Sequence, residues 1–365
     1  MNGRRLFEIL PGLLTWLTLI LVGLFSWLAP ATIAVFIIVF DTYWLFKTVY
    51  LALHLRSSYA KMMVNLKTDW NVRLAGTSWK NIYHLVILPM YNEPYEVVRD
   101  TFESLANNNY PKDRLIVVLA AEERAPAETS GTIKRIQEEY GQKFFKFLTT
   151  LHPKDLPGEI AGKGSNSAWA AKEARKLIDD LKIPHENILV SVFDADTQVF
   201  PDYFNCLAWN FINAEHPQRS SFQPIPFFTN NIYQTPALAR VVAFSSTFWQ
   251  MILQVRSERL VTFSSHSMPF KALVEIGYWQ TSVVSEDSRI FWQSFLHYNG
   301  DWRVVPLLYP VSMDANVAPS FWKTLINLYK QQRRWAYGSE NIAYIFGGFL
   351  KNKLIPWKQK FKSGH

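Results

Sequence analysis

The sequence predicts an α/β protein with a largely parallel sheet, preceded by two helices that cross a membrane. From Tyr83 onward, short runs rich in Val, Ile, Leu and Phe alternate with stretches whose apolar residues recur every three or four positions. This alternation is typical of a parallel sheet covered by helices. Before Tyr83, two long apolar stretches follow each other closely, and they predict the membrane helices.

The first apolar stretch, residues 10–28, carries no charged residue and is long enough to cross a hydrocarbon core of roughly 30 Å. The second, residues 31–55, is interrupted by Asp41 and Lys47. Basic residues precede the first stretch and follow the second: Arg4, Arg5, Arg56, Lys61, Lys67 and Arg73. By the positive-inside tendency, we expect a multi-pass protein of the plasma or inner membrane with its catalytic part in the cytosol. A signal peptide is the alternative for the first stretch.

Composition narrows the classes of partner. Hydrophobic residues make up 49% of the 365 residues and aromatic residues 15%, which indicates that part of the surface meets membrane lipids. The net charge of +8 favours an anionic partner. Nucleic acid is not expected, because the basic residues do not form one run interleaved with aromatic residues. Cys206 is the only cysteine, which excludes an intrachain disulfide and a zinc site built on cysteines.

The catalytic part is expected over residues 81–315, after membrane helices in 1–55 and a cytosolic linker in 56–80, and before an interfacial helix and basic tail in 316–365. Strands are predicted over 84–90, 115–121, 144–150 and 188–193, and helices over 96–108, 129–140 and 166–181. Ligands of open α/β sheets collect at the carboxyl ends of the strands. The polar segments "PMYNEP", "AAEER" and "DADTQ" fall there.

Asp194 and Asp196 follow the last of these strands. Two carboxylates at such a corner cannot both be buried without a compensating positive charge. Mg²⁺ or Mn²⁺ takes one or two carboxylates together with substrate phosphates, so this pair indicates a cation bound to a diphosphate. A turn stabilised by the aspartate side chains is the alternative.

The segment "AGKGSN", residues 161–166, precedes a predicted helix. Its backbone N–H groups and Lys163 could bind phosphate oxygens. The spacing is wrong for a Walker A loop, and Gly164 replaces the required Ser or Thr. A flexible glycine turn with a solvated lysine is the alternative.

Glu286 and Asp287 open another predicted helix in "SEDSRIFWQSFL". One of them could accept a proton from a sugar or alcohol nucleophile. Acidic residues are also common in the first turn of a helix, where they interact favourably with its dipole. Both interpretations remain open at this point.

The segment "QQRRWAYG", residues 331–338, follows "FWKTLINLYK", whose apolar residues form one broad helical face. Such a helix can lie in the membrane interface with its basic side chains toward the headgroups. Arginine beside tryptophan also offers a contact for a diphosphate and a stacking surface for a sugar. A basic amphipathic helix with no further role is the alternative.

The order of these motifs is more specific than any one of them. Tyr-Asn-Glu after the first strand, Gly-Lys-Gly-x-Asn before a helix, Asp-x-Asp, Glu-Asp and Gln-x-x-Arg-Trp follow one another between residues 84 and 338. This order resembles the membrane-embedded family-2 glycosyltransferases, such as the cellulose, chitin and hyaluronan synthases. The resemblance implies the Rossmann-like GT-A fold, a mixed sheet with helices on both faces. It also implies a nucleotide-sugar donor, usually of UDP, a divalent cation (Mg²⁺ or Mn²⁺), and inversion at the anomeric carbon.

The resemblance also assigns roles to residues. It implies that Tyr91 and Glu93 hold the nucleoside and that Lys163 holds its phosphates. Asp194 and Asp196 would bind the diphosphate and the metal. Asp287 would be the catalytic base, with Glu286 beside it. The diphosphate and the acceptor sugar would be covered by Gln331, Arg334 and Trp335.

Two segments depart from the family pattern. The family places an aspartate after its second strand to contact the base, whereas here Glu122 or Glu123 must substitute. The acceptor-side loop reads "FSSHSM", in which His266 is either an acceptor or phosphate contact or a structural residue. The segment after residue 338 is too short to span a membrane, whereas the processive synthases of this family continue into further membrane helices. Either the chain is truncated or its product is not secreted through it.

The expected function is transfer of a sugar to a glycan acceptor, extending a β-linked glycan. A lipid-linked acceptor and a catalytically silent nucleotide-binding scaffold are the alternatives.

Overall fold

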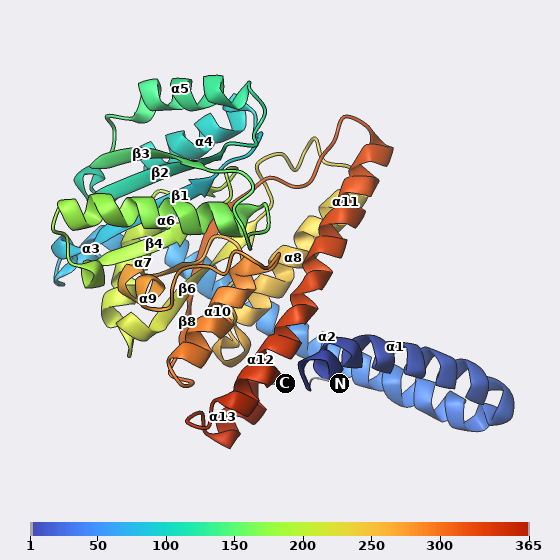
Figure 1. Ribbon diagram of the computed structural model, residues 1–365. Helices are drawn as coiled ribbons and strands as arrows, with labels where there is room; N and C mark the ends of the chain where they lie inside the picture. Colours follow the sequence, from blue (N-terminus) through green and yellow to red (C-terminus); the bar gives the residue numbers. More distant parts are fainter. Residues whose placement is uncertain (1–2, 364–365) are drawn as a thin grey trace.

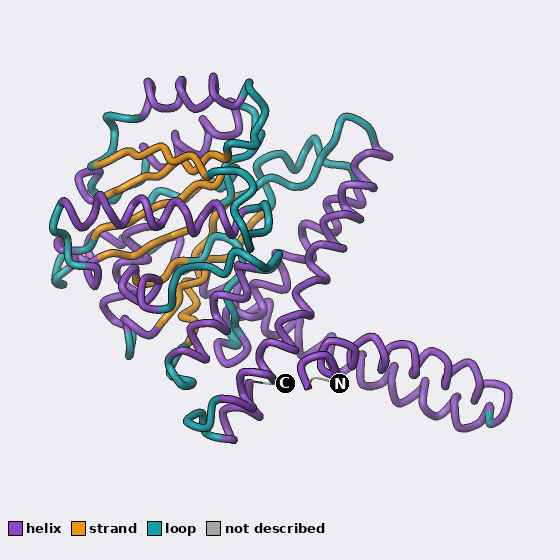
Figure 2. The backbone as a smooth tube through the Cα atoms, in the orientation of Figure 1, coloured by secondary structure: helices purple, strands orange, loops and turns teal. Residues whose placement is uncertain are grey.

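The computed structural model describes residues 3–363 and has one eight-stranded sheet between layers of helices, with a helical hairpin projecting from it (Figures 1 and 2). The strands are β1 (Tyr83–Pro89), β2 (Leu115–Glu122), β3 (Lys146–His152), β4 (Ile188–Val192), β5 (Gln198–Val199), β6 (Ser220–Phe227), β7 (Ser267–Pro269) and β8 (Arg303–Ser312). The helices are α1 (Gly3–Leu28), α2 (Pro30–Lys67), α3 (Trp70–Leu74), α4 (Tyr95–Ala106), α5 (Thr129–Tyr140), α6 (Lys163–Asp180), α7 (Tyr203–Asn213), α8 (Ala237–Gln254), α9 (Phe270–Glu275), α10 (Glu286–His297), α11 (Phe321–Ala336), α12 (Glu340–Lys351) and α13 (Trp357–Ser363).

The sheet has the order β3-β2-β1-β4-β7-β6-β8-β5. Strands β1 to β4 pair in parallel, and β6 pairs in parallel with β8. Strand β7 is antiparallel to both β4 and β6, and β5 is antiparallel to β8. The carboxyl ends of β1, β2, β4 and β8 therefore lie along one edge of the sheet, where ligands of such folds bind.

The predicted α/β fold, with its mixed sheet and helices on both faces, is confirmed. The four predicted strands correspond to β1–β4 and the three helices to α4–α6, with ends shifted by a few residues. Strands β5–β8 were not predicted. Helix α6 begins at Lys163, so the glycine-rich segment forms its first turn instead of preceding it.

Two hydrophobic cores cover the two faces of the sheet. On one face, the described residues of α6, α9, α10 and α12 pack against β1, β2 and β4. On the other face lie α3, α4, α5 and α7. Strands β1, β2 and β4 are buried on both sides, which explains their nearly continuous apolar sequences.

Helices α1 and α2 pack side by side and extend away from the sheet (Figure 1). Both are long and apolar enough to cross a membrane, and their most apolar segments are not buried in the protein. Helix α2 continues past residue 55 without a break, so residues 56–67, expected in a linker, are helical. Met62 packs against Ile225 of β6 and Met251 of α8, which fixes the hairpin to the body that contains the sheet.

Helices α11 and α12 follow each other along the side of the body nearest the hairpin (Figure 1). The apolar face predicted for helix α11 is only partly covered by the body: Leu328 is buried, whereas Trp322 and Tyr329 are exposed. Helix α12, in the segment too short to span a membrane, packs against α1 and α10. The rings of Phe7 and Phe346 stack there at 5.2 Å between centroids.

His84 is a buried polar residue near the start of β1. Its ring lies between Tyr110 and Phe204, with centroids 4.6 and 4.8 Å away, and neither ring nitrogen has a hydrogen-bond partner. Burial lowers the pKa of His84 to about 3, because a charged imidazole would lose its hydration. The folded protein therefore holds this ring neutral where the unfolded chain would protonate it.

We predict that His84 makes the protein sensitive to acid. Its folded pKa lies below the unfolded value, so the unfolded chain binds the extra proton and stability falls as the pH drops from 6.5 toward 3. Relative to wild type, His84→Leu should gain roughly 1 kcal/mol in unfolding free energy for each pH unit in that window. Denaturant unfolding in detergent at several pH values measures this, with exposed His297→Leu as the control. An equal difference at pH 7.5 and pH 4.5 would contradict it.

Candidate active site

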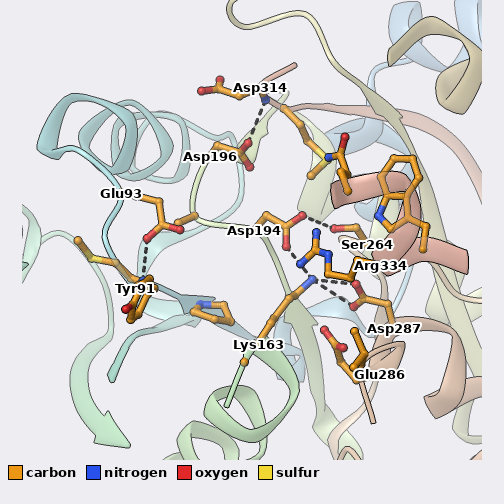
Figure 3. A pocket seen from close by; sticks show the side chains of 18 of the residues that line it. Tyr91, Glu93, Lys163, Asp194, Asp196, Ser264, Glu286, Asp287, Asp314 and Arg334 are labelled. Atoms are coloured by element: carbon orange, nitrogen blue, oxygen red, sulfur yellow. Dashed lines mark hydrogen bonds and ion pairs between the residues drawn. The ribbon is translucent and has the colours of Figure 1, made fainter. Parts of the chain in front are cut away.

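A cavity of about 690 Å³ opens at the carboxyl-end edge of the sheet. Its lining comes from the ends of β1, β2, β4 and β8, the first turns of α6 and α10, and the last turns of α11. Figure 3 shows charged side chains from these distant segments pointing toward one another. Acidic residues outnumber basic ones in the lining.

Lys163 lies between two carboxylates at the centre of the cavity (Figure 3). Its Nζ is 2.7 Å from Oδ1 of Asp194 and donates to both carboxylate oxygens of Asp287, at 3.1 and 3.0 Å. Ser264 donates a further hydrogen bond of 2.7 Å to Asp194. Burial opposes ionisation of Asp194, but Lys163, Ser264 and Arg334 together hold the pKa of this carboxyl below its ordinary value.

Close packing favours the glycine after Lys163. A Cβ on Gly164 would lie 3.0 Å from the Cβ of Glu286, so Glu286 would have to move by a few tenths of an ångström. The absence of a side chain lets helix α6 start directly against the first turn of α10. The contact brings Lys163 and Asp287 together, although they are far apart in the sequence.

Asp196 and Asp314 form an acidic corner beside this centre (Figure 3). The backbone N–H of Asp314 donates to Oδ2 of Asp196 at 3.1 Å, but Oδ1 of Asp196 is buried without a hydrogen-bond partner. Burial, together with the charges of Asp194 and Asp314, raises the pKa of Asp196 well above its ordinary value. A buried carboxylate oxygen without a partner fits a ligand for a hard cation.

A complete metal site is not preformed. Within residues 3–363, no three His, Cys, Asp or Glu side chains are placed to hold a metal ion together. Asp194 and Asp196 could therefore supply only part of a coordination sphere. Mg²⁺ and Mn²⁺ commonly complete such a sphere with phosphate oxygens and water.

Glu286 lies beside Asp287 at the start of α10 but is more deeply buried. Burial and the neighbouring charge of Asp287 raise the pKa of Glu286 to about 8. Glu286 is therefore largely protonated at neutral pH. A carboxyl group in that state is a poor proton acceptor, so Asp287 is the better base of the two.

The wall formed by the ends of β1 and β2 carries Tyr91, Glu93 and Glu122. The backbone N–H groups of Tyr91 and Asn92 donate to Oε2 of Glu93, at 2.7 and 3.1 Å. Glu122 is buried and pairs with Arg124, whose guanidinium lies 4.5 Å from the ring centre of Tyr91. Glu122, not Glu123, is thus the acidic side chain at the end of β2 that lines the cavity.

Helix α11 covers the opposite side of the cavity with Gln331, Arg334 and Trp335. Arg334 points toward the carboxylates of Asp194 and Asp287 (Figure 3). The ring of Trp335 meets that of Phe263 edge to face at 6.2 Å. The guanidinium of Arg334 and the flat apolar ring of Trp335 therefore form the α11 side of the cavity that contains Lys163.

His266 lies behind the cavity and does not line it. Its Nδ1 is 2.9 Å from the carbonyl oxygen of Phe263 and 3.8 Å from Oδ1 of Asp287. Burial lowers its pKa. In the "FSSHSM" loop, Ser264 is the side chain that reaches the cavity, and His266 lies behind Asp287.

The cavity brings together ten of the residues singled out from the sequence: Tyr91, Glu93, Glu122, Lys163, Asp194, Asp196, Asp287, Gln331, Arg334 and Trp335. Glu286 also lines it, whereas His266 does not. Sequence reasoning missed Arg124, Ser264 and Asp314. Asp314 follows a strand that was itself not predicted, so its position at the end of β8 gave no signal.

Comparison with known proteins agrees with the predicted family. Residues 189–360 match the model of the family described as "Glycosyl transferase family group 2". A Bacillus subtilis protein named "Probable glycosyltransferase YdaM" is 24% identical over 72% of this chain and 56% of its own length. The poly-β-1,6-N-acetyl-D-glucosamine synthase of Staphylococcus aureus is 26% identical over 86% of this chain and 66% of its own length. The chain thus spans between about half and two thirds of these relatives. The predicted resemblance to family-2 glycosyltransferases is confirmed.

Two solved structures resemble the model at low sequence identity. A mannosyltransferase of Pyrobaculum calidifontis in complex with GDP-mannose and Mn²⁺ has a TM-score of 0.47 and 16% identity, covering 86% of this chain and 84% of its own. The TarS protein of Staphylococcus aureus (residues 1–349) in complex with UDP-GlcNAc has a TM-score of 0.42 and 14% identity, covering 65% and 60%.

We predict that Lys163 stabilises the fold by neutralising the two carboxylates. Lys163→Met should lower the unfolding free energy at pH 8 by roughly 2 kcal/mol, below the cost of breaking a fully buried pair, because the two carboxylates left unpaired are only partly buried. The loss should shrink at pH 5, because an unpaired Asp194 has a raised pKa and takes up a proton.

Denaturant unfolding at both pH values measures this effect. Lys176→Met is the matched control, since Lys176 is exposed and pairs with Glu173 on the surface, where an ion pair contributes under about 1 kcal/mol. A Lys163→Met protein as stable as that control at pH 8 would show that the central lysine is not needed for neutralisation.

Proposed function

We propose that this chain, whose residues 189–360 form a glycosyl transferase family group 2 region, is an inverting, metal-dependent glycosyltransferase. It would transfer a sugar from a nucleotide-sugar, in our proposal a UDP-sugar, to a glycan acceptor at the membrane. The observation that carries the proposal is the position of Lys163 between Asp194 and Asp287. It places a cation suited to a phosphate next to a carboxylate suited to act as a base.

The donor would lie along the edge of the sheet. Tyr91, Glu93 and Glu122 offer an aromatic ring and two carboxylates for the nucleoside, and Lys163 and Arg334 offer cations for the diphosphate. The N-terminus of α6 also faces the cavity, and helix N-termini favour bound phosphates. Gln331 and Trp335 would contact the diphosphate and the acceptor sugar.

A divalent cation would be held by Asp194 and Asp196, with Asp314 nearby. The excess of acidic side chains in the lining would repel a diphosphate unless a further positive charge were present. When bound, Mg²⁺ or Mn²⁺ would offset the negative charge of the diphosphate leaving group. The unpartnered Oδ1 of Asp196 supports this assignment.

The chain's own residues would carry out the proton transfer. Asp287 accepts the proton of the acceptor hydroxyl while the hydroxyl oxygen bonds to the anomeric carbon and the bond to the diphosphate breaks. Lys163 and Arg334 stabilise the charge that develops on the departing diphosphate. One carboxylate suffices for this single displacement, which inverts the anomeric configuration. Glu286, protonated at neutral pH, would donate a hydrogen bond instead of competing for the proton.

The acceptor would be the growing end of a β-linked glycan. The relative that synthesises poly-β-1,6-N-acetyl-D-glucosamine supports this choice. Transfer of one sugar to a lipid-linked acceptor is the second candidate, favoured by the exposed apolar side chains of α8 and of α11, the helix whose last turns line the cavity. The length of the product distinguishes the two.

The membrane arrangement is also part of the proposal. Residues 1–55 would cross the plasma membrane twice, residues 81–315 would be the cytosolic catalytic domain, and residues 316–365 would lie at the lipid surface. The exposed Trp322 and Tyr329 of α11 support the last point, since aromatic residues favour the membrane interface. Lipids would thus be partners of α1, α2 and α11.

We predict that Asp287→Asn removes turnover but preserves donor binding. Loss of the general base should lower kcat by about 10²–10⁴-fold, while the nucleoside and diphosphate contacts remain. Nucleotide release from a panel of UDP- and GDP-sugars by the detergent-solubilised protein measures turnover, and titration with the free nucleotide measures binding. Exposed Asp180→Asn is the control. Nucleotide release at the wild-type rate by Asp287→Asn would exclude Asp287 as the base.

We predict that turnover depends on a divalent cation held at Asp196. Chelation should abolish nucleotide release, and added Mn²⁺ or Mg²⁺ should restore it. Asp196→Asn should need a higher metal concentration, because one anionic ligand is lost. Titration of activity with metal measures this, with Asp155→Asn as the control outside the main cavity. Full activity in the presence of a chelator would refute the metal assignment.

A further inference from the structure

Arg289 is a buried arginine two residues after the proposed base. Its side chain is only 5% exposed, and its backbone N–H donates the first helical hydrogen bond of α10, to the carbonyl of Ser285 at 2.9 Å. It does not line the donor cavity. A buried charge is costly unless well paired, so the partners of this arginine indicate what it does.

The guanidinium joins α10 to the first turn of α12. Nε donates to Oδ1 of Asn341 at 2.5 Å, and an η nitrogen lies 3.6 Å from Oε1 of Glu340. The other η nitrogen donates to Gln280 at 2.9 Å. The ring of Tyr344 lies beneath the guanidinium at 4.1 Å, a distance typical of a cation–π contact.

Further hydrogen bonds connect the same two helix starts. Ser285 donates to Oε1 of Glu340 at 2.9 Å, and Asn341 donates to Ser288 at 2.9 Å. Ser285 and Ser288 immediately flank Glu286 and Asp287. The start of α12 therefore contacts the residues on both sides of Glu286 and Asp287, the segment that carries the proposed base.

Helix α12 continues almost directly from α11, which carries Gln331, Arg334 and Trp335. Glu340 is only five residues beyond Trp335. Through its contacts with Glu340 and Asn341, Arg289 links the helix that carries the base to the segment that covers the cavity. These two walls come from separate parts of the chain and have to stay in register for the reaction.

We propose that Arg289 is a positioning residue: by fastening the start of α12 to the start of α10, it sets the position of Asp287 relative to Lys163 and to the α11 wall. The role rests on the proposed transferase function. It predicts an effect on the chemical step without loss of the donor site, because none of the nucleoside contacts involves α12.

The test compares Arg289→Met with Arg289→Lys, Asn341→Ala and the control Arg303→Met, whose arginine pairs with Glu215 on the surface. Rates are expressed per donor site, counted by nucleotide titration, so that unfolded protein does not lower kcat. Arg289→Met should lower kcat about 100-fold, the effect expected of a shift of about 1 Å in a reacting group, with an unchanged KM for the donor. Arg289→Lys and Asn341→Ala should fall between wild type and Arg289→Met, because each keeps part of the contact set.

Hydrogen exchange provides a readout that does not need activity. In Arg289→Met, the amides of residues 285–289 and 340–344 should exchange faster together, while those of β1 and β2 stay protected. Unchanged exchange in both segments, or a wild-type kcat per site, would overturn the proposal. If the wild-type protein turns over no donor, the transferase proposal fails, and the exchange result alone decides whether Arg289 couples the two helices.

Discussion

The site depends on the cation of Lys163 lying between the carboxylates of Asp194 and Asp287. Each carboxylate alone would be costly to bury, and together they would repel each other. The lysine offsets their charges, and in our proposal the same cation would serve the diphosphate of a bound donor. The three side chains come from separate parts of the chain, and the fold brings them together.

The fold achieves this by converging three distant segments on one edge of the sheet. Strand β4 ends at Val192 and delivers Asp194, α6 starts at Lys163, and α10 starts at Glu286. Gly164 allows the two helix starts to touch. Helix α11 then closes the cavity, and α12 connects that closure to α10 on one side and to α1 on the other. The helical hairpin of α1 and α2 and the candidate active site thus share a packing partner.

The sequence identified the parallel half of the sheet because its strands are continuous apolar runs between clear helical patterns. Strands β6 and β8 each contain two prolines, a residue that argues against a central strand because it cannot donate to the ladder. Strands β5 and β7 have only two and three residues, too few to show a pattern. These strands form because neighbouring strands of the sheet supply their hydrogen-bonding partners. Such pairing is decided by the tertiary structure and leaves no pattern in the local sequence.

The residues of the candidate site also divide into those that the sequence could predict and those that only the tertiary structure reveals. Motif order identified the residues that project directly into the cavity, such as Lys163 and Asp287, because chemistry restricts which residue types stand there. It could not separate Ser264 from His266 in one short loop, since only the direction of each side chain decides which of them faces the cavity. It also gave no indication of Arg289, whose partners on α12 lie more than fifty residues further along the chain.

The most direct test of the account is the crystal structure of this protein with a nucleoside diphosphate and Mn²⁺, with anomalous scattering recorded at the manganese absorption edge. We expect an anomalous peak beside the carboxylates of Asp194 and Asp196, and diphosphate oxygens in contact with Lys163 and Arg334. A diphosphate bound away from Lys163, or a cavity without an anomalous peak at saturating Mn²⁺, would contradict the central claim.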